Sequence, residues 1–146
     1  MTHQIFYFDI KHAIKEHHWI IEHSGGLPGN KEIHLLESVL NNIQNDLYYP
    51  TFIDKLTHLV FSVNKFHPFN DGNKRSSLVL GAYFLELNGY GYCVNKFIVE
   101  MENIVVWLAD NKINKDLLLD IIQSLIEEVE LNESTKLKLI NSIGFS

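Results

Sequence analysis

The chain has 146 residues, of which 46% are hydrophobic and 21% charged, and its formal net charge is −6. This length and composition are typical of one soluble globular domain, residues 1–146, and the negative charge argues against direct nucleic-acid binding, which needs a basic surface. A single cysteine, no signal-peptide pattern and no apolar run near the roughly 20 residues that span a bilayer favour a cytoplasmic protein without membrane contact.

The spacing of apolar residues predicts helices along nearly the whole chain, so the expected fold class is all-α. After a short β-prone opening at residues 4–8, apolar positions recur every three or four residues, the period of an amphipathic helix. Capping residues and glycine or proline stops separate the segments. We expect helices at residues 9–23, 32–46, 54–66, 74–87, 96–111, 115–129 and 134–143.

The first predicted helix is rich in histidine, with His12, His17, His18 and His23. A zinc site on a helix needs ligands at a spacing such as His-Glu-x-x-His, and this helix has no such match. We therefore expect these histidines to be core or solvent-exposed side chains. A metal hydrolase that uses the histidines is the weakest of the alternative functions.

The next segment, Ser24-Gly25-Gly26-Leu27-Pro28-Gly29-Asn30, is a dense turn signal. Glycine and proline at this density interrupt regular structure. Taken by itself, the segment predicts a connector between the first two helices.

The most informative run is His67-Pro68-Phe69-Asn70-Asp71-Gly72-Asn73-Lys74-Arg75-Ser76-Ser77. Residues 78–85 follow it and are apolar on every side, which is typical of a buried helix. The polar run is therefore predicted to lie at the N-terminal end of a central helix. There the unpaired N–H groups and the helix dipole attract anions.

The side chains of this run fit the chemistry of phosphate transfer. The imidazole of His67 can accept a proton from an attacking hydroxyl. Asp71 offers the carboxylate that Mg²⁺ takes in addition to phosphate oxygens. We expect His67 to be the general base, Asp71 the metal ligand and Phe69 an anchor in the core, with a nucleotide phosphate site formed by Gly72, Asn73, Lys74 and Arg75.

The run resembles the Fic/Doc (Fido) signature, His-x-Phe-x-[Asp/Glu]-Gly-Asn-[Gly/Lys]-Arg. It looks closest to the Doc branch, the death-on-curing toxins, in which Lys replaces the second glycine. The segment Gly25-Gly26-Leu27-Pro28-Gly29 is also similar to one in Doc-type toxins. The resemblance implies a compact Fido-type helical bundle around the central helix, with a small β-like flap before the motif.

The resemblance also implies a bacterial toxin-like transferase that uses ATP and Mg²⁺ to modify a hydroxyl side chain of a target protein. As in Doc toxins, the group moved would be the γ-phosphoryl, and the target a translation factor such as elongation factor Tu. Residues 24–34 would form the flap, which docks an extended target segment by β-strand pairing.

Restraint of such a toxin is expected to come from a second protein. Some Fic proteins inhibit themselves through a helix that bears [Ser/Thr]-x-x-x-Glu-[Gly/Asn]. The nearest match here begins at Ser124 and fails, because Val129 follows Glu128. The resemblance therefore implies a separate antitoxin that supplies the inhibitory helix.

Two further alternatives stay open. Typical Fic enzymes transfer AMP and carry a second arginine three residues after the first, where this chain has Leu78. AMP transfer to a protein hydroxyl is therefore one alternative to phosphorylation, because both reactions would use the same phosphate site. The other is a non-catalytic module that binds nucleotide or a partner.

Overall fold

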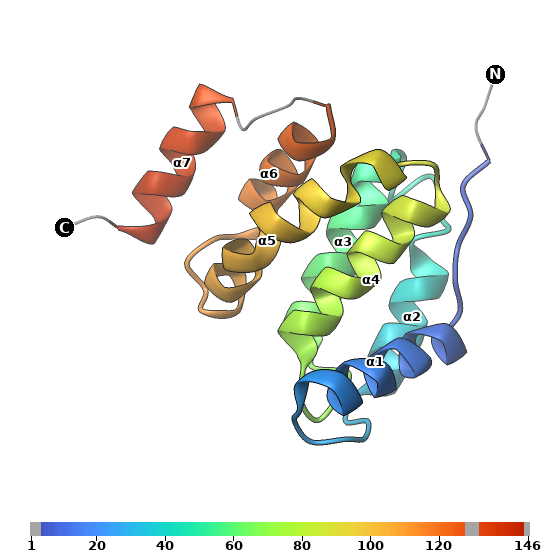
Figure 1. The fold of residues 1–146 in the computed structure, drawn as a ribbon. Helices are drawn as coiled ribbons and strands as arrows, with labels where there is room; N and C mark the ends of the chain where they lie inside the picture. Colours follow the sequence, from blue (N-terminus) through green and yellow to red (C-terminus); the bar gives the residue numbers. More distant parts are fainter. Residues whose placement is uncertain (1–3, 128–131, 145–146) are drawn as a thin grey trace.

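The computed structural model describes residues 4–127 and 132–144, which are helical without any strand (Figure 1). This confirms the predicted all-α fold class. A single 3₁₀ turn, η1 (Gly91–Cys93), precedes α5. The α-helices are α1 (Ile10–Ser24), α2 (Ile33–Asn42), α3 (Phe52–Phe66), α4 (Asn73–Leu87), α5 (Val94–Ala109), α6 (Lys115–Glu127) and α7 (Glu133–Ile143).

The helices α3 and α4 lie side by side in the bundle, and the other helices except α7 pack around this pair. α1 and α5 contact α4, α2 and α6 contact α3, and α7 packs on α6 (Figure 1). At Gly81 in α4, an added Cβ would lie 2.9 Å from Val60 Cγ2 and 3.1 Å from Phe97 Cζ. A glycine at this position therefore allows α4 to approach α3 and α5 closely.

Side-chain hydrogen bonds explain where two helices depart from their predicted bounds. α3 begins at Phe52, before residue 54, because Thr51 and Asp54 form a reciprocal capping box. α2 ends at Asn42 rather than at residue 46. Just beyond it, the wholly buried Lys55 donates to the Ile43 carbonyl at 2.7 Å and pairs with Asp46 at 2.8 Å.

The remaining predictions hold with small shifts, apart from the β-prone opening. α5 begins and ends two residues before its predicted bounds, and α6 is described as far as Glu127, so its predicted end at residue 129 lies outside the described residues. Residues 4–8 form no strand. Within the described residues, no helix is both long and apolar enough to cross a bilayer.

Candidate active site

The motif run forms the loop between α3 and α4, and residues with positive φ mark its two ends. α3 ends where His67 adopts φ 51° and ψ 58°, and α4 begins after Gly72 at φ 74°. Glycine adopts such a conformation readily, but histidine does so only at an energetic cost. The loop therefore needs surrounding bonds that hold His67 in place.

The Asn73 side chain provides bonds that close this loop. Its Oδ1 accepts from the Phe69 N–H at 3.1 Å, and its Nδ2 donates to the Phe69 carbonyl at 3.0 Å. The same Nδ2 lies 3.4 Å from His67 Nδ1, at the long end of the hydrogen-bond range. Asn73 is buried and Phe69 is wholly buried, so the loop is fixed to the core while His67 stays exposed.

His17 of α1 packs against the motif loop and bonds to it. Its ring stacks on Phe69 with centroids 3.9 Å apart and planes 3° apart. Burial lowers the pKa of His17, so the ring is neutral at pH 7, and its Nε2–H donates to the Asp71 carbonyl at 2.7 Å. The expectation that the α1 histidines include core side chains is thus confirmed at His17, and the described residues hold no group of three or more metal-ligating side chains.

Asp71 presents its carboxylate at the same loop. Oδ1 accepts from the Gly72 N–H at 2.8 Å and Oδ2 accepts from the Leu27 N–H at 3.0 Å. These two bonds lower the pKa of Asp71 from its ordinary value of 3.8, so the group is an anion at pH 7. Each oxygen keeps a lone pair, so the carboxylate fits the single protein ligand that Mg²⁺ takes when phosphate and water supply the rest.

The loop and the start of α4 line a cavity of about 490 Å³. It lies within the size range of ligand sites and is open to solvent. The cavity gathers the general-base, metal-ligand and phosphate-site residues that the sequence predicts. Its lining residues are Asn64, His67, Asn70, Asp71, Gly72, Asn73, Lys74, Arg75 and Ala109.

The N-terminal end of α4 offers unpaired donors to this cavity. The first intrahelical bond runs from the Ser76 N–H to the Gly72 carbonyl at 2.8 Å, and no acceptor faces the N–H groups of Asn73, Lys74 and Arg75 within the described residues. Lys74 is exposed and has no carboxylate partner there. Together with the helix dipole, these groups favour an anion at this position.

Arg75 is engaged with the segment that follows α1. Its Nη1 donates to the Gly25 carbonyl at 2.8 Å and to Ser24 Oγ. The guanidinium is thus turned toward the glycine-rich turn, although it also borders the cavity.

The expected flap, residues 24–34, lies directly against the motif loop. An isolated antiparallel bridge joins Asn30 to Phe69, with the Asn70 N–H donating to the Gly29 carbonyl at 3.0 Å. The Lys31 N–H donates to the Pro68 carbonyl at 2.9 Å. The segment that includes Gly25, Gly26, Leu27, Pro28 and Gly29 is exposed, and it is paired with the motif without forming a regular strand.

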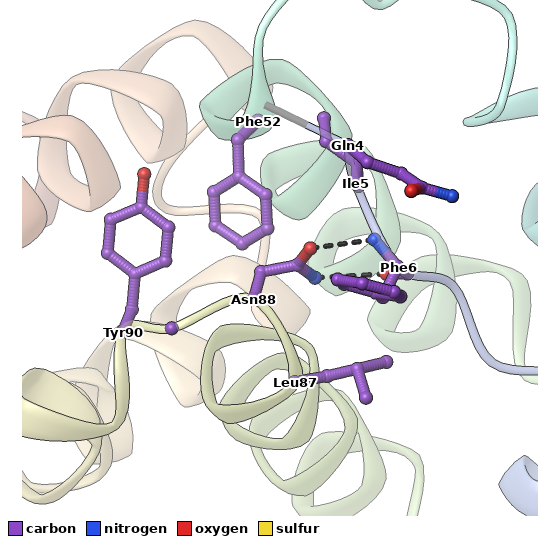
Figure 2. Close-up of a pocket in the computed structure, with 8 residues that line it drawn as sticks. Gln4, Ile5, Phe6, Phe52, Leu87, Asn88 and Tyr90 are labelled. Carbon is purple, nitrogen blue, oxygen red and sulfur yellow. Dashed lines mark hydrogen bonds between the residues drawn. The ribbon is translucent and has the colours of Figure 1, made fainter. Parts of the chain in front are cut away.

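A larger cavity, of about 760 Å³, lies at the other end of α4 (Figure 2). Its walls are mostly apolar, with the rings of Phe52 and Tyr90 stacked at 4.8 Å between centroids. The side chain of Asn88 makes two hydrogen bonds to the backbone of Phe6 beside it. No residue of the motif run lines this cavity.

Sequence reasoning found the residues that the motif loop and the start of α4 contribute to the smaller cavity, but not Asn64 of α3 or Ala109 of α5, and it missed three features that hold the site. It assigned Asn73 to phosphate, whereas the structure uses its side chain to close the loop. It gave no role to His17 under Asp71, although the place of His17 between Ala13 and Ile20 on the apolar face of α1 was a signal of burial. It also did not foresee the bonds from Arg75 to the turn after α1.

Comparison with known families and proteins adds one match. A family model described as the Fic/DOC family matches residues 7–85, which is more than half of the chain and includes both the flap and the motif run. No curated protein matches the chain.

Proposed function

The chain belongs to the Fic/DOC family, whose enzymes are generally transferases that act on protein hydroxyls, and from this premise we propose that it uses Mg²⁺–ATP to modify a hydroxyl of another protein. The observation that carries the proposal is the convergence of three groups on one cavity. These are His67, the Asp71 carboxylate and the N–H groups at the start of α4, which have no acceptor in the part of the chain that the structure describes.

Each group has a defined part in the proposed reaction. His67 takes the proton from the target hydroxyl, whose oxygen attacks the phosphorus while the bond to the leaving phosphate oxygen breaks. The N–H groups of residues 73–75 and the Lys74 ammonium stabilise the charge that develops on the phosphate oxygens. Asp71 would hold Mg²⁺, which neutralises phosphate charge when it is bound.

Within this reaction class, we favour transfer of the γ-phosphoryl group to a translation factor such as elongation factor Tu, with ADP as the leaving group. The support is the pair of departures at Lys74 and Leu78 from the pattern of AMP-transferring members. Leu78 packs against the core and does not line the cavity, so no second cation stands there to grip the distal phosphates. A nucleotide in the reverse orientation would present its γ-phosphate to the hydroxyl.

The test uses ATP labelled separately at the α and γ positions, incubated with a bacterial cell extract and the purified chain. Label from γ-labelled ATP alone should appear on a protein of the extract. Label from α-labelled ATP would replace phosphorylation by AMP transfer, and no label from either would favour the non-catalytic binding module. The matched controls are His67→Ala, which should abolish labelling, and His18→Ala, which changes an exposed histidine of α1 and should not.

We also propose that the chain restrains growth unless a separate antitoxin supplies an inhibitory helix. The support is the failed self-inhibitory pattern after Ser124, part of which lies outside the described residues. Expression of the chain alone should slow the growth of bacteria, and His67→Ala or Asp71→Ala should restore it. Slow growth that persists in both variants would point to aggregation or another non-catalytic cause.

A further inference from the structure

Arg75 is built into the contact between the flap and the motif loop. Both hydrogens of Nη1 are used, one on the Gly25 carbonyl and one on Ser24 Oγ. The Ser24 hydroxyl donates its own hydrogen to the Ile20 carbonyl at 2.7 Å, so its lone pairs are free to accept from Arg75. The guanidinium thereby joins α4 to the C-terminal end of α1.

Two glycines make room for this side chain. An added Cβ at Gly26 would lie 3.0 Å from Arg75 Nη2, and one at Gly72 would lie 3.2 Å from the same atom. A side chain at Gly26 would therefore force the Asp71 carboxylate to shift and the guanidinium to give way, and one at Gly72 would require the guanidinium to move by a few tenths of an ångström. The glycine of the motif therefore accommodates the folded-back guanidinium as well as opening the backbone to a ligand.

A second bond ties the same turn to the loop. The Leu27 N–H donates to Asp71 Oδ2, and an added Cβ at Gly26 would lie 2.7 Å from that oxygen. The flap turn, residues 24–27, is thus held on one side by a guanidinium and on the other by a carboxylate. Both charges come from the motif, and the turn contributes backbone atoms and one hydroxyl.

Lys74, the cation next to Arg75 in the chain, is not tied to the flap turn in this way. Lys74 is exposed at the cavity and has no carboxylate partner among the described residues. The N–H groups of Asn73, Lys74 and Arg75 also have no acceptor there. These groups suffice for an anion site without the two Nη1 hydrogens of Arg75.

We propose that Arg75 is a positioning residue, whose guanidinium fixes the flap turn over Asp71, and that Lys74 and the free N–H groups of α4 bind the phosphates. The phosphate part rests on the proposed function. The consequence is a division of labour between adjacent cations. Arg75 would hold the flap, which receives the target, in position, and Lys74 would determine the affinity for nucleotide.

The test compares Arg75→Lys with Lys74→Gln in the full chain. Arg75→Lys keeps the positive charge but loses the planar fork that spans two acceptors. Amide hydrogen exchange of residues 25–31 should become about tenfold faster in Arg75→Lys, because the turn opens more often. Affinity for Mg²⁺–ATP, measured by calorimetry, should change by less than about threefold in Arg75→Lys and fall by about tenfold or more in Lys74→Gln, with exchange of the turn unchanged.

A glycine pair provides a matched control for the turn itself. Gly25 (φ 85°) and Gly26 (φ 120°) both have positive φ, but an added Cβ meets nothing within 4 Å at Gly25 and meets Asp71 and Arg75 at Gly26. Both alanine variants therefore share the backbone strain, and only Gly26→Ala should displace the turn from Arg75. Exchange of residues 27–31 should rise more in Gly26→Ala than in Gly25→Ala.

A kinetic readout separates positioning from a general structural role. The protein of the extract that takes the label is first purified and then used as the substrate. Arg75→Lys and Ser24→Ala should raise the KM for this protein. The KM for ATP and kcat should stay within about twofold of wild type. A merely destabilising change would lower the active fraction and reduce the rate without moving either KM.

The outcomes distinguish this inference from the proposed function. If Arg75→Lys weakens Mg²⁺–ATP binding as much as Lys74→Gln and leaves exchange of the turn as in wild type, Arg75 is a phosphate ligand and the inference is wrong. A wild-type chain that binds no Mg²⁺–ATP overturns the proposed function, and the phosphate part of the inference with it. Exchange of the turn in Arg75→Lys then still decides the positioning role.

Discussion

The two ends of α4 use the same hydrogen-bonding device in different surroundings. At the start of the helix, the Asn73 amide pairs with both the N–H and the carbonyl of Phe69. At its end, the Asn88 amide pairs in the same way with Phe6 (Figure 2). Each asparagine thus fixes one segment of backbone beside a cavity.

The surroundings decide which end is suited to chemistry. At the C-terminal end, the carbonyls of Leu85 and Glu86 accept from the N–H groups of residues 88–90, and the larger cavity is lined mainly by apolar side chains. At the N-terminal end, three N–H groups have no acceptor among the described residues, and they lie beside two cations and a carboxylate. Available polar groups, rather than cavity size, thus distinguish the end of α4 at which we propose that the reaction occurs.

The largest effect should come from removing the base at the N-terminal end. His67→Ala should reduce the rate of target modification by about 10²- to 10⁴-fold, because the attacking hydroxyl keeps its proton. The thermal unfolding midpoint should not fall, since the exposed His67 side chain makes only one long contact within the described residues. The positive φ at this position is unfavourable for histidine as well as for alanine. A variant that modifies the target at the wild-type rate would contradict the assignment.

Removing the asparagine at this end should cost stability as well as activity. Asn73→Ala leaves the N–H and carbonyl of a wholly buried Phe69 without partners, which should lower the free energy of unfolding by about 2–4 kcal/mol. Urea denaturation measures this change. A loss below about 0.5 kcal/mol would show that water replaces the amide and that the loop does not depend on it.

The matching change at the other end should cost less. Asn88→Ala removes two bonds to Phe6 that are exposed to solvent and one part-buried bond to the Phe84 carbonyl, so water can replace part of what is lost. We expect a decrease of about 1 kcal/mol in the free energy of unfolding, together with faster amide exchange at residue 6. Affinity for Mg²⁺–ATP should equal that of wild type, and a reduced affinity would show that the two ends of α4 are coupled.

The contact between His58 of α3 and Lys115 of α6 lies outside both ends of α4 and serves as a reference for them. Burial, with the Lys115 charge 2.7 Å away, lowers the pKa of His58 from 6.5 to about 4. The unfolded chain takes up a proton first as the pH falls, so stability should decrease between pH 6.5 and pH 4. We expect a loss of somewhat under about 1 kcal/mol at pH 5 after screening by solvent, and His58→Gln should flatten this part of the pH profile.

The sequence predicted most of the fold because helix signals are local. Apolar residues three and four apart, the Asp9 cap of α1 and the glycine stop after Leu87 indicate helices without knowledge of the rest of the chain. The end of α2 was wrong because it depends on Lys55, a residue outside that helix. The β-prone opening was wrong because residues 4–8 find the Asn88 side chain and no partner strand.

The candidate site also has features that the sequence determined and features that only the packing decided. The run from His67 to Arg75 is contiguous, so its residues share one loop and one helix end whatever the packing. The sequence alone therefore determined which motif groups meet at the cavity, whereas Asn64 and Ala109 reach it only through packing. Only the tertiary structure decided which groups are already engaged. His17 reaches Asp71 across 54 residues, Leu27 reaches it across 44, and Arg75 reaches Gly25 across 50.

The physical reason is that a motif specifies donors and acceptors but not the partners that satisfy them. A carboxylate or a guanidinium has several bonding positions, and packing α1 against α4 brings backbone groups within reach of some of them. Residue order therefore determined the chemistry available at the start of α4. The packing of the flap turn decided that Arg75 is tied to the flap while Lys74 has no carboxylate partner in the described residues.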